Sequence, residues 1–367
     1  IFSLIYLIME SMKTKDGYEM IKERVTIQDI ANALGLSRTT VSKALNGAPN
    51  MPEKTVNSVL QMAKKLNYKQ FSYLNLEEYN GVPAQGGTFA LFANYIPEQF
   101  HIATSIMASL EQEMRKYGYS LTVYMLNPDD VLSLKLPKNF RLDQTDAILC
   151  IELFNQKYSE MVCSLGKPVL FFDSYYAPER PPLNANILLM ESRSSTFRMI
   201  NTILSYRPLK HIGFIGDINH CISFHERYEG FLNALDANNV PFTESYCIKE
   251  DDSLFQDTAF LYRSLSNMEH LPELFFCAND LLAWRTLSAL KQMGVKVSRD
   301  ILLCGFDDTL SMNPMDSTLT TVKTPSREMG IAAARTLMNQ LENPDLPSSI
   351  IYLNGEIRMR ASTFYED

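Results

Sequence analysis

The chain lacks an apolar run long enough to cross a membrane. The longest candidate covers only residues 1–9, whereas a transmembrane helix needs about 20 apolar residues. No basic residue precedes this stretch and no small-residue cleavage site follows it, so it is also a poor signal peptide. Because the chain opens on Ile, we treat residues 1–22 as an uncertain N-terminal extension, with Met12 or Met20 as possible starts. These observations predict a cytoplasmic protein without membrane association.

Cysteine is scarce, and its spacing suits neither a metal site nor a disulfide framework. None of the six cysteines forms a C-x-x-C pair, and several lie inside apolar runs such as 147–151 and 301–304. Such cysteines are typical of buried free thiols in a reducing compartment. His220, Cys221 and His225 also match no standard metal-binding spacing. We therefore predict no metal site.

Catalytic motifs are absent as well. The sequence contains no Gly-x-Ser-x-Gly elbow, no Gly-rich phosphate loop and no His-Glu-x-x-His. Asp307 and Asp308 are adjacent in the chain, whereas a glycosidase needs two carboxyl groups that face each other across the substrate. We expect a protein that is not an enzyme and that uses no cofactor.

Charge is divided unevenly along a chain of otherwise ordinary globular composition. The 367 residues carry a net charge of −8, which argues against nucleic-acid binding by bulk charge. Residues 20–70, however, hold eight basic and three acidic residues, a net charge of +5 that leaves −13 for the rest of the chain. A basic segment joined to an acidic body indicates an anionic partner for that segment alone.

The length predicts two or three domains.

Three short helices are predicted within the basic segment. The first begins at a Thr26 cap and ends at Gly35, and the second follows a Ser37 cap. A third starts near Pro52, with apolar residues recurring every three or four positions. Helices joined by a tight glycine-containing turn predict a helix-turn-helix unit. We place this domain at residues 23–69.

A linker over residues 70–86 precedes a second region, residues 87–367, in which strands alternate with helical patterns. One helical pattern spans residues 102–117. The strands are apolar throughout, which is typical of a parallel sheet covered by helices on both faces, so the fold class is α/β. The predicted strands are residues 88–93, 120–126, 147–151, 169–172, 212–215, 274–277 and 301–304.

Several motifs carry a family resemblance. Residues 25–47, VTIQDIANALGLSRTTVSKALNG, closely resemble the N-terminal helix-turn-helix of the lactose/galactose repressor (LacI/GalR) family of bacterial transcription regulators. The second region contains further motifs in the order that this family places them: ERYEGF at 226–231, AND at 278–280, GFDD at 305–308 and LTTV at 319–322. The resemblance implies a body of two lobes, similar to periplasmic sugar-binding proteins, with an effector between them.

The second helix of the predicted helix-turn-helix unit is expected to read DNA. A recognition helix enters the major groove with its N-terminal residues against base edges. Arg38 and Thr39 are therefore expected to contact bases, and the resemblance adds Lys43. Short polar side chains suit phosphates better, and the remaining candidates are Thr26, Ser37, Thr40, Ser42 and Asn46. The alternative is that these residues are the caps and solvated face of an ordinary three-helix unit.

The sequence departs from the family after the third helix. The family usually has a hinge helix there whose leucine enters the minor groove, but residues 70–78 lack the expected arginines and Glu77 falls near the leucine position. The negative potential of the minor groove repels a carboxylate. Either Leu74 or Leu76 takes this role in a shifted register, or the protein bends DNA little.

Effector contacts are expected just after strands, where two-lobed binding proteins hold their ligand. Asp and Asn suit a polyhydroxylated ligand, and an arginine can hold paired hydroxyls or an acidic group. The candidates after strands are Asn94, Asp173, Asn279 and Asp307, and the resemblance adds Ser223 and Arg227 at the start of a helix. The alternative is that Asp and Asn at strand ends are caps and turn formers. The aromatic platform that often stacks on a sugar falls near Asp252, so it is missing or moved to Phe255.

These features predict a sequence-specific DNA-binding transcription regulator, a repressor, controlled by a small-molecule effector, a sugar or sugar derivative. One head reads one half-site, so a palindromic operator implies a homodimer. The first lobe is predicted to span about 87–186 and 323–348, and the second about 187–322 and 349–367. The alternative from another class is a sugar-binding receptor without a DNA role.

Overall fold

The computed structural model describes residues 26–45, 51, 52, 54–56, 58, 59, 62, 86–94, 102–309 and 318–364. The chain divides into two units, residues 1–82 and 83–367, which we call the head and the body. The predicted N-terminal extension and all but the last residue of the predicted linker lie outside the described residues, and with them Leu74, Leu76 and Glu77. No helix in the described part is long and apolar enough to cross a bilayer.

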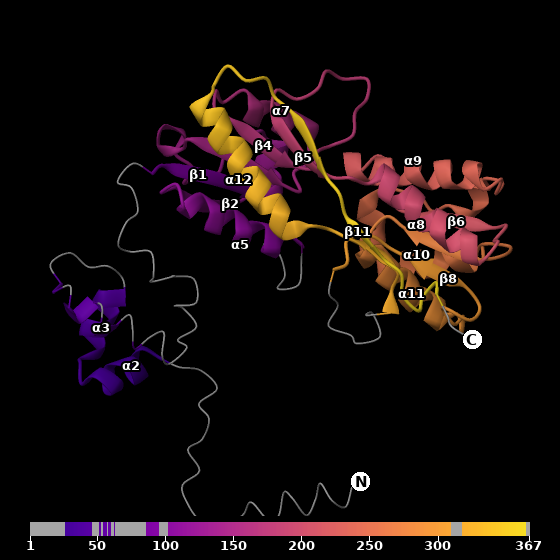
Figure 1. Cartoon of the computed structure of the whole chain (residues 1–367), viewed down its shortest axis with the longest axis horizontal. Helices are drawn as coiled ribbons and strands as arrows, with labels where there is room; N and C mark the ends of the chain where they lie inside the picture. Colours follow the sequence, from indigo (N-terminus) through magenta and orange to yellow (C-terminus); the bar gives the residue numbers. More distant parts are fainter. Residues whose placement is uncertain are drawn as a thin grey trace, which may run out of the picture. The chain divides into compact units, whose positions relative to one another are not determined.

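Helices α2 (Ile27–Leu34) and α3 (Arg38–Leu45) of the head are joined by a tight turn (Figure 1). Both helices occupy the predicted ranges. Gly35 between them has a φ of 63°, a left-handed conformation that favours glycine and ends α2. Helical residues at 54–56, 58 and 59 agree with the predicted third helix. The core of the head consists of Ile30, Ala31, Val41, Ala44 and Val59.

The first lobe of the body is built on a sheet of six parallel strands, in the order β10-β5-β4-β3-β1-β2. The strands are β1 (Thr88–Ala93), β2 (Ser120–Met125), β3 (Ala147–Ile151), β4 (Val169–Phe172), β5 (Asn186–Met190) and β10 (Ile350–Leu353). The helices of this lobe are α5 (Ile102–Arg115), α6 (Pro128–Leu132), α7 (Gln156–Cys163) and α12 (Ser326–Glu342).

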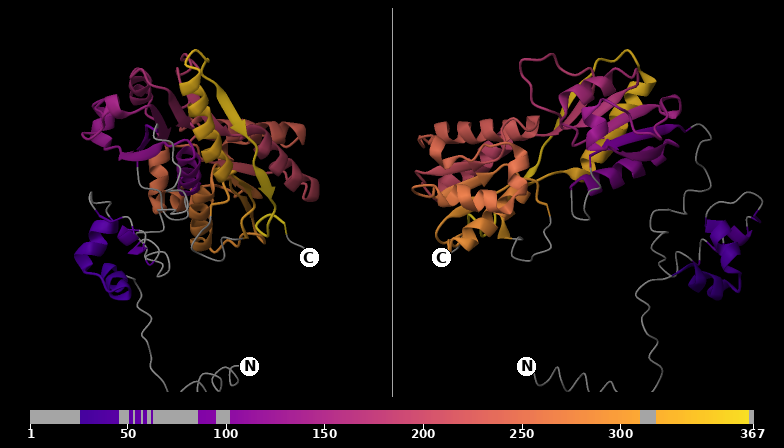
Figure 2. Two further views of the ribbon diagram at one scale, coloured as in Figure 1. Left: turned by 60° about the vertical axis from the view of Figure 1, so that its left-hand side comes forward. Right: turned by 180° about the vertical axis from the view of Figure 1, so that it is seen from behind.

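Helices cover both faces of this sheet, as its apolar strands predict. Alternate residues of β1 enter two different cores: Phe89 and Leu91 pack with α5 and α12, whereas Phe92 packs with α7. Helices α5 and α12 lie side by side on one face (Figures 1 and 2). Gly330 permits this approach, because a Cβ there would lie 2.3 Å from the carbonyl oxygen of Ile106.

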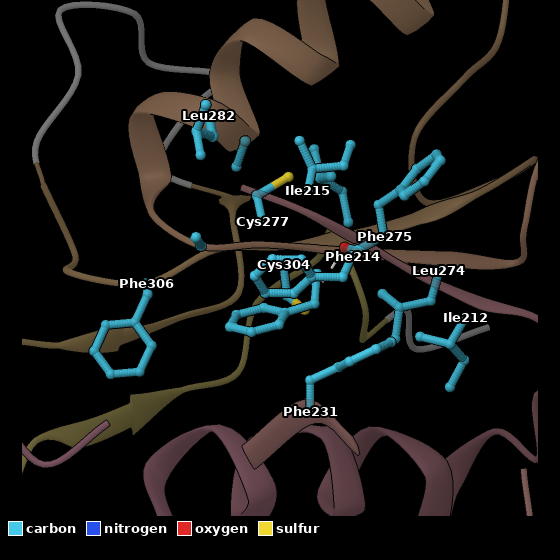
Figure 3. Packing of buried hydrophobic residues seen from close by; sticks show 14 of the residues in the cluster. Ile212, Phe214, Ile215, Phe231, Leu274, Phe275, Cys277, Leu282, Cys304 and Phe306 are labelled. Atoms are coloured by element: carbon cyan, nitrogen blue, oxygen red, sulfur yellow. Dashed lines mark hydrogen bonds between the residues drawn. The ribbon is translucent and has the colours of Figure 1, made fainter. Parts of the chain in front are cut away.

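The second lobe is built on three parallel strands, in the order β6-β7-β8. They are β6 (Ile212–Ile215), β7 (Leu274–Cys277) and β8 (Leu302–Cys304). The helices of this lobe are α8 (Arg193–Tyr206), α9 (Ile222–Ala237), α10 (Thr258–Ser266) and α11 (Asp280–Gln292). Its core gathers apolar side chains from all three strands, and Phe231 of α9 packs among them (Figure 3). Strands β9 (Thr321–Lys323) and β11 (Glu356–Arg358) add an antiparallel pair that the sequence analysis did not predict.

The predicted lobe boundaries need two corrections. Residues 187–190 belong to β5, which pairs with β4 of the first sheet rather than entering the second lobe. Residues 350–353 form β10, which pairs with β5 and so also lies in the first lobe. Both strands are held by parallel backbone hydrogen bonds to segments distant in sequence. Among the elements that the structure describes, the chain therefore crosses between the lobes three times: after β5, between β9 and α12, and between β10 and β11.

Candidate DNA-reading helix and effector site

Helix α3 presents polar side chains on its exposed surface. Arg38, Thr39 and Lys43 are exposed, and no side-chain hydrogen bond or ion pair joins them to another residue that the structure describes. Ile30 of α2 and Val41 of α3 are fully buried in the core of the head. The head thus fixes α3 through its apolar side and leaves these three side chains available to a partner.

Three of the other candidates on the head, Thr26, Ser37 and Thr40, take part in local hydrogen bonds. The Ser37 hydroxyl oxygen accepts the backbone N–H of Thr40 at 3.0 Å and lies 2.7 Å from the Thr40 hydroxyl. Thr26 donates its backbone N–H and its hydroxyl to the Asp29 carboxylate, at 2.9 and 2.6 Å. Such bonds satisfy or orient groups at helix N-termini. Ser42 is half-buried, and Asn46 lies outside the described residues. Contacts of these five with DNA stay predictions.

Arg227 and Asp307 come together in the body. Arg227, 4% exposed on α9, donates from Nη1 to the carbonyl oxygen of Ala278 at 2.6 Å and from Nη2 to Asp307 Oδ1 at 3.0 Å. Its guanidinium carbon lies 3.8 Å from the centre of the Phe306 ring. Asp307 has a φ of 107°, a strained conformation of the kind that gathers at functional sites. Two predicted effector residues thus form a largely buried ion pair.

Asp173 and Ser223 form a second group. Asp173 directly follows β4 with a φ of 61°, and its Oδ1 accepts the backbone N–H of Ser174 at 2.7 Å and of Ser223 at 3.4 Å. Burial raises the pKa of Asp173, while hydrogen bonds from Cys221, Ser174 and Ser223 and the charge of Arg227 oppose this rise. The two groups meet on α9, which carries Ser223 and Arg227 one turn apart.

The two predicted asparagines take the structural roles of the alternative interpretation. Asn279 caps α11, because its side-chain oxygen accepts the backbone N–H of Leu282 at 2.8 Å. Asn94 donates to the carbonyl oxygen of Glu152 at 2.6 Å and so joins the ends of β1 and β3. In the described part of the chain, no hydrogen bond joins Asn94 to another candidate effector residue. A role toward the effector stays a prediction for both.

Sequence reasoning missed Asp280, although it belongs to the AND motif. Asp280 is 2% exposed; its Oδ1 accepts the Thr321 hydroxyl at 2.8 Å and its Oδ2 accepts the Thr309 N–H at 3.0 Å. Burial and the negative charges of Asp307 and Asp308 raise the pKa of Asp280 well above its usual value. The side chain therefore fastens the loop after β8 to β9, and this loop carries Asp307.

The aromatic groups near the site differ from the expectation. Phe255 is fully buried in the core of the second lobe, so it does not supply an exposed stacking platform. Phe306 lies instead against the Arg227 guanidinium, and Phe224 has its ring centre 5.6 Å from the same group. Phe306 lies within the GFDD motif, and this motif is the sequence feature that could have identified it. Among the described residues, no cluster of His, Cys, Asp or Glu is arranged to hold a metal ion.

Comparison with known proteins matches both units. Residues 26–70 match the family model "Bacterial regulatory proteins, lacI family", and residues 205–363 match "Periplasmic binding protein-like domain". Over 343 residues the chain is 24% identical to the HTH-type transcriptional repressor PurR of Mannheimia succiniciproducens, covering 92% of this chain and 98% of that protein. Over 342 residues it is 23% identical to catabolite control protein A of Priestia megaterium, covering 92% and 99%.

Solved structures share the fold. A complex of the transcriptional regulator CelR with cellobiose matches with a TM-score of 0.64 and 19% identity, covering 92% of this chain and all of that one. The lac repressor dimer bound to operator and the anti-inducer ONPF matches with a TM-score of 0.59 and 19% identity, covering 94% and 100%.

A helix-turn-helix head followed by a two-lobed α/β body defines an effector-controlled DNA-binding transcription regulator. The chain thus combines a helix-turn-helix segment that matches the lacI family with a periplasmic-binding-protein-like domain, and it is similar over most of its length to HTH-type repressors.

Proposed function

We propose that the protein is a repressor that binds a palindromic operator as a homodimer. A sugar or sugar derivative bound in the body weakens or strengthens this DNA binding. Relatives named as repressors and the operator-bound lac repressor dimer support this proposal. One helix-turn-helix reads one half-site, so two-fold symmetry in the operator calls for two copies of the chain.

The observation that carries the DNA-binding part is the exposure of Arg38, Thr39 and Lys43 on α3. An exposed arginine at the N-terminal end of a recognition helix can form two hydrogen bonds to one guanine. The head is also the basic part of an acidic chain, so its attraction to phosphates is confined to residues 20–70.

The effector part is supported by the polar groups on and around α9. Asp173, Arg227 and Asp307 supply hydrogen-bond acceptors and donors suited to sugar hydroxyls. They come from the end of β4, from α9 and from the loop after β8, so one ligand can bridge elements of both lobes. The CelR neighbour is titled as a complex with cellobiose.

A gel-shift titration against the DNA upstream of the protein's own coding region tests the DNA-binding part. We expect specific binding that weakens as salt rises, because each neutralised phosphate releases counterions. Arg38→Ala should weaken binding to this DNA and leave binding to random DNA nearly unchanged. Wild-type binding that is absent, or that is independent of both sequence and salt, would sink the proposal.

A sugar panel followed by thermal unfolding tests the effector part. A ligand at 100 times its dissociation constant stabilises a protein by about 2.7 kcal/mol. We expect at least one sugar to raise the unfolding temperature of the wild type. The same sugar should not stabilise Arg227→Lys, which keeps the positive charge but lacks the planar guanidinium that can donate two parallel hydrogen bonds. Equal stabilisation of both proteins would place the ligand elsewhere.

A further inference from the structure

The first turns of α9 belong to the second lobe but make polar contacts with the first. The Ile222 N–H donates to the carbonyl oxygen of Ser174 at 2.9 Å, and the Ser223 N–H donates to Asp173 Oδ1 at 3.4 Å. Cys221, at the N-cap position, makes no side-chain cap bond within its own helix. The loop that follows β4 therefore accepts the backbone N–H groups of Ile222 and Ser223 at the start of α9.

Two further contacts join the same turns of α9 to the first lobe. The Tyr176 ring is stacked on the His225 ring, with centres 3.6 Å apart and planes within 14°. The Tyr352 hydroxyl, on β10, donates to Glu226 Oε1 at 2.7 Å. Tyr176 follows β4 in the chain, so both tyrosines come from the first lobe. Residues 222–226 are thus held at one end by Asp173 and Ser174 and along one side by two tyrosines.

The contact also leaves polar atoms unsatisfied. The Ser174 hydroxyl oxygen and Glu226 Oε2 are buried and have no hydrogen-bond partner among the described residues. Burial raises the pKa of Glu226, which the hydrogen bond from Tyr352 and the charge of Arg193 oppose. Buried polar atoms without partners cost free energy. The joint between the lobes is therefore specific in geometry yet incompletely satisfied, as expected for a contact that opens.

We propose that residues 222–226 of α9, held by Asp173, Ser174, Tyr176 and Tyr352, form a lock between the lobes that an effector must open. Asp173 is a candidate ligand-binding residue whose Oδ1 already accepts a hydrogen bond from α9, so a ligand hydroxyl that bonds Oδ1 competes with the helix. Tyr176, Tyr352, His225 and Glu226 are then positioning residues that set how readily Asp173 is released. The inference rests on the proposed function only for the presence of a ligand at Asp173.

Hydrogen–deuterium exchange of the full chain without ligand tests the lock directly. Tyr352→Phe removes the hydroxyl that bonds Glu226 and keeps the ring. Losing a hydrogen bond to an ionisable group should speed exchange of the amides at 222–226 by about fivefold or more, because local opening becomes more frequent. Tyr176→Leu, which removes the stacked ring, should act in the same direction. Tyr262→Phe, at an exposed tyrosine on α10, is the matched control and should behave as wild type.

The residues at which hydrogen–deuterium exchange becomes faster distinguish a lock from general stabilisation. Faster exchange confined to residues 222–226 in Tyr352→Phe and Tyr176→Leu supports the proposal. Unchanged exchange there in both variants overturns it, and so does an equal increase at residues 228–235 and in β7, which would report a structural role alone.

A ligand arm uses D-ribose and cellobiose as probes. If the ligand binds the unlocked state, weakening the lock raises its apparent affinity. Tyr352→Phe should therefore lower the dissociation constant of a probe that binds the wild type, and a higher constant would overturn the lock. If neither probe binds, the exchange measurement still decides the lock, whereas failure of the full sugar panel counts against the proposed effector class.

Discussion

In the head, the side chains of Arg38, Thr39 and Lys43 are exposed and make no hydrogen bond or ion pair with described residues, whereas in the body those of Arg227, Asp173 and Asp307 are already bonded to protein groups. A surface of the first kind binds a large partner without rearrangement. A site of the second kind binds a small ligand only by exchanging internal hydrogen bonds for ligand bonds. This difference suits a reader of DNA joined to a body that changes state when a ligand arrives.

The largest effect should come from breaking the ion pair in the body. Arg227→Ala leaves Asp307 with a largely buried and uncompensated charge, which typically costs about 3–5 kcal/mol of unfolding free energy. Denaturant unfolding of the full chain measures this cost. Arg299→Ala, which removes an exposed partner of Asp300, is the control and should leave the unfolding free energy unchanged. Equal behaviour of the two variants would mean that the Arg227 pair does not hold the site together.

In the head, a substitution should change DNA affinity and leave folding stability unchanged. Arg38→Ala should weaken binding to the specific DNA by about 1–3 kcal/mol, roughly 5- to 150-fold, because one side chain can distinguish a base pair by that amount. The unfolding free energy should not change, since Arg38 is exposed. Fluorescence anisotropy and denaturant unfolding measure the two quantities. A loss of stability as large as the loss of affinity would show that Arg38 supports the fold of the head.

Buried carboxyl groups should make the stability of the body depend on pH. Because the pKa of Asp280 is raised, the folded protein holds the carboxyl proton of Asp280 more tightly than the unfolded chain does. In the unfolded chain an Asp has a pKa of about 3.9. Its stabilising contribution is therefore present below that pKa and is lost as pH rises through the raised value, with a slope of at most about 1.4 kcal/mol per pH unit.

Asp280→Asn tests this pH dependence, because an amide keeps the shape and does not titrate. Thermal unfolding between pH 5 and 8 should show a flatter profile for Asp280→Asn than for the wild type. Identical slopes would mean that other groups carry the pH dependence.

The smallest effect should be found at the cap of α3. Ser37→Ala removes the hydroxyl oxygen that accepts the Thr40 N–H, and such a loss typically costs about 1 kcal/mol. Hydrogen–deuterium exchange over residues 26–45 should increase for Ser37→Ala and stay at the wild-type level for Thr39→Ala, which makes no such bond. Weaker DNA binding by Ser37→Ala without faster exchange would favour a direct phosphate contact instead.

The head was predictable from sequence because its determinants are local. Caps, the glycine turn and apolar residues every three or four positions lie within a few residues of one another, and α2 and α3 match the predicted ranges. The seven predicted strands of the body were also found, because each is an apolar run. Strands β5, β9, β10 and β11 were not predicted. Strands β9, β10 and β11 are short and depend on pairing with distant segments, whereas β5 is an apolar run that was not assigned as a strand. The lobe boundaries were wrong because β5 and β10 were not placed in the first sheet.

The contacts within the site could not be derived from sequence spacing. Asp173 and Ser223 are 50 positions apart, and Arg227 and Asp307 are 80 apart. Motifs identified these residues as candidates, but only the fold shows that they bond to one another. Tyr352 carried no sequence signal, because an exposed tyrosine on an edge strand is ordinary and its bond to Glu226 depends on how the lobes meet.

The central claim is that ligand binding in the body controls DNA binding by the head. The most direct test measures operator affinity by fluorescence anisotropy with and without a sugar that raises the unfolding temperature. Allosteric coupling is typically worth 1–3 kcal/mol, so we predict a change of about 5- to 150-fold in the dissociation constant. A sugar that stabilises the body and leaves operator affinity unchanged would contradict the account.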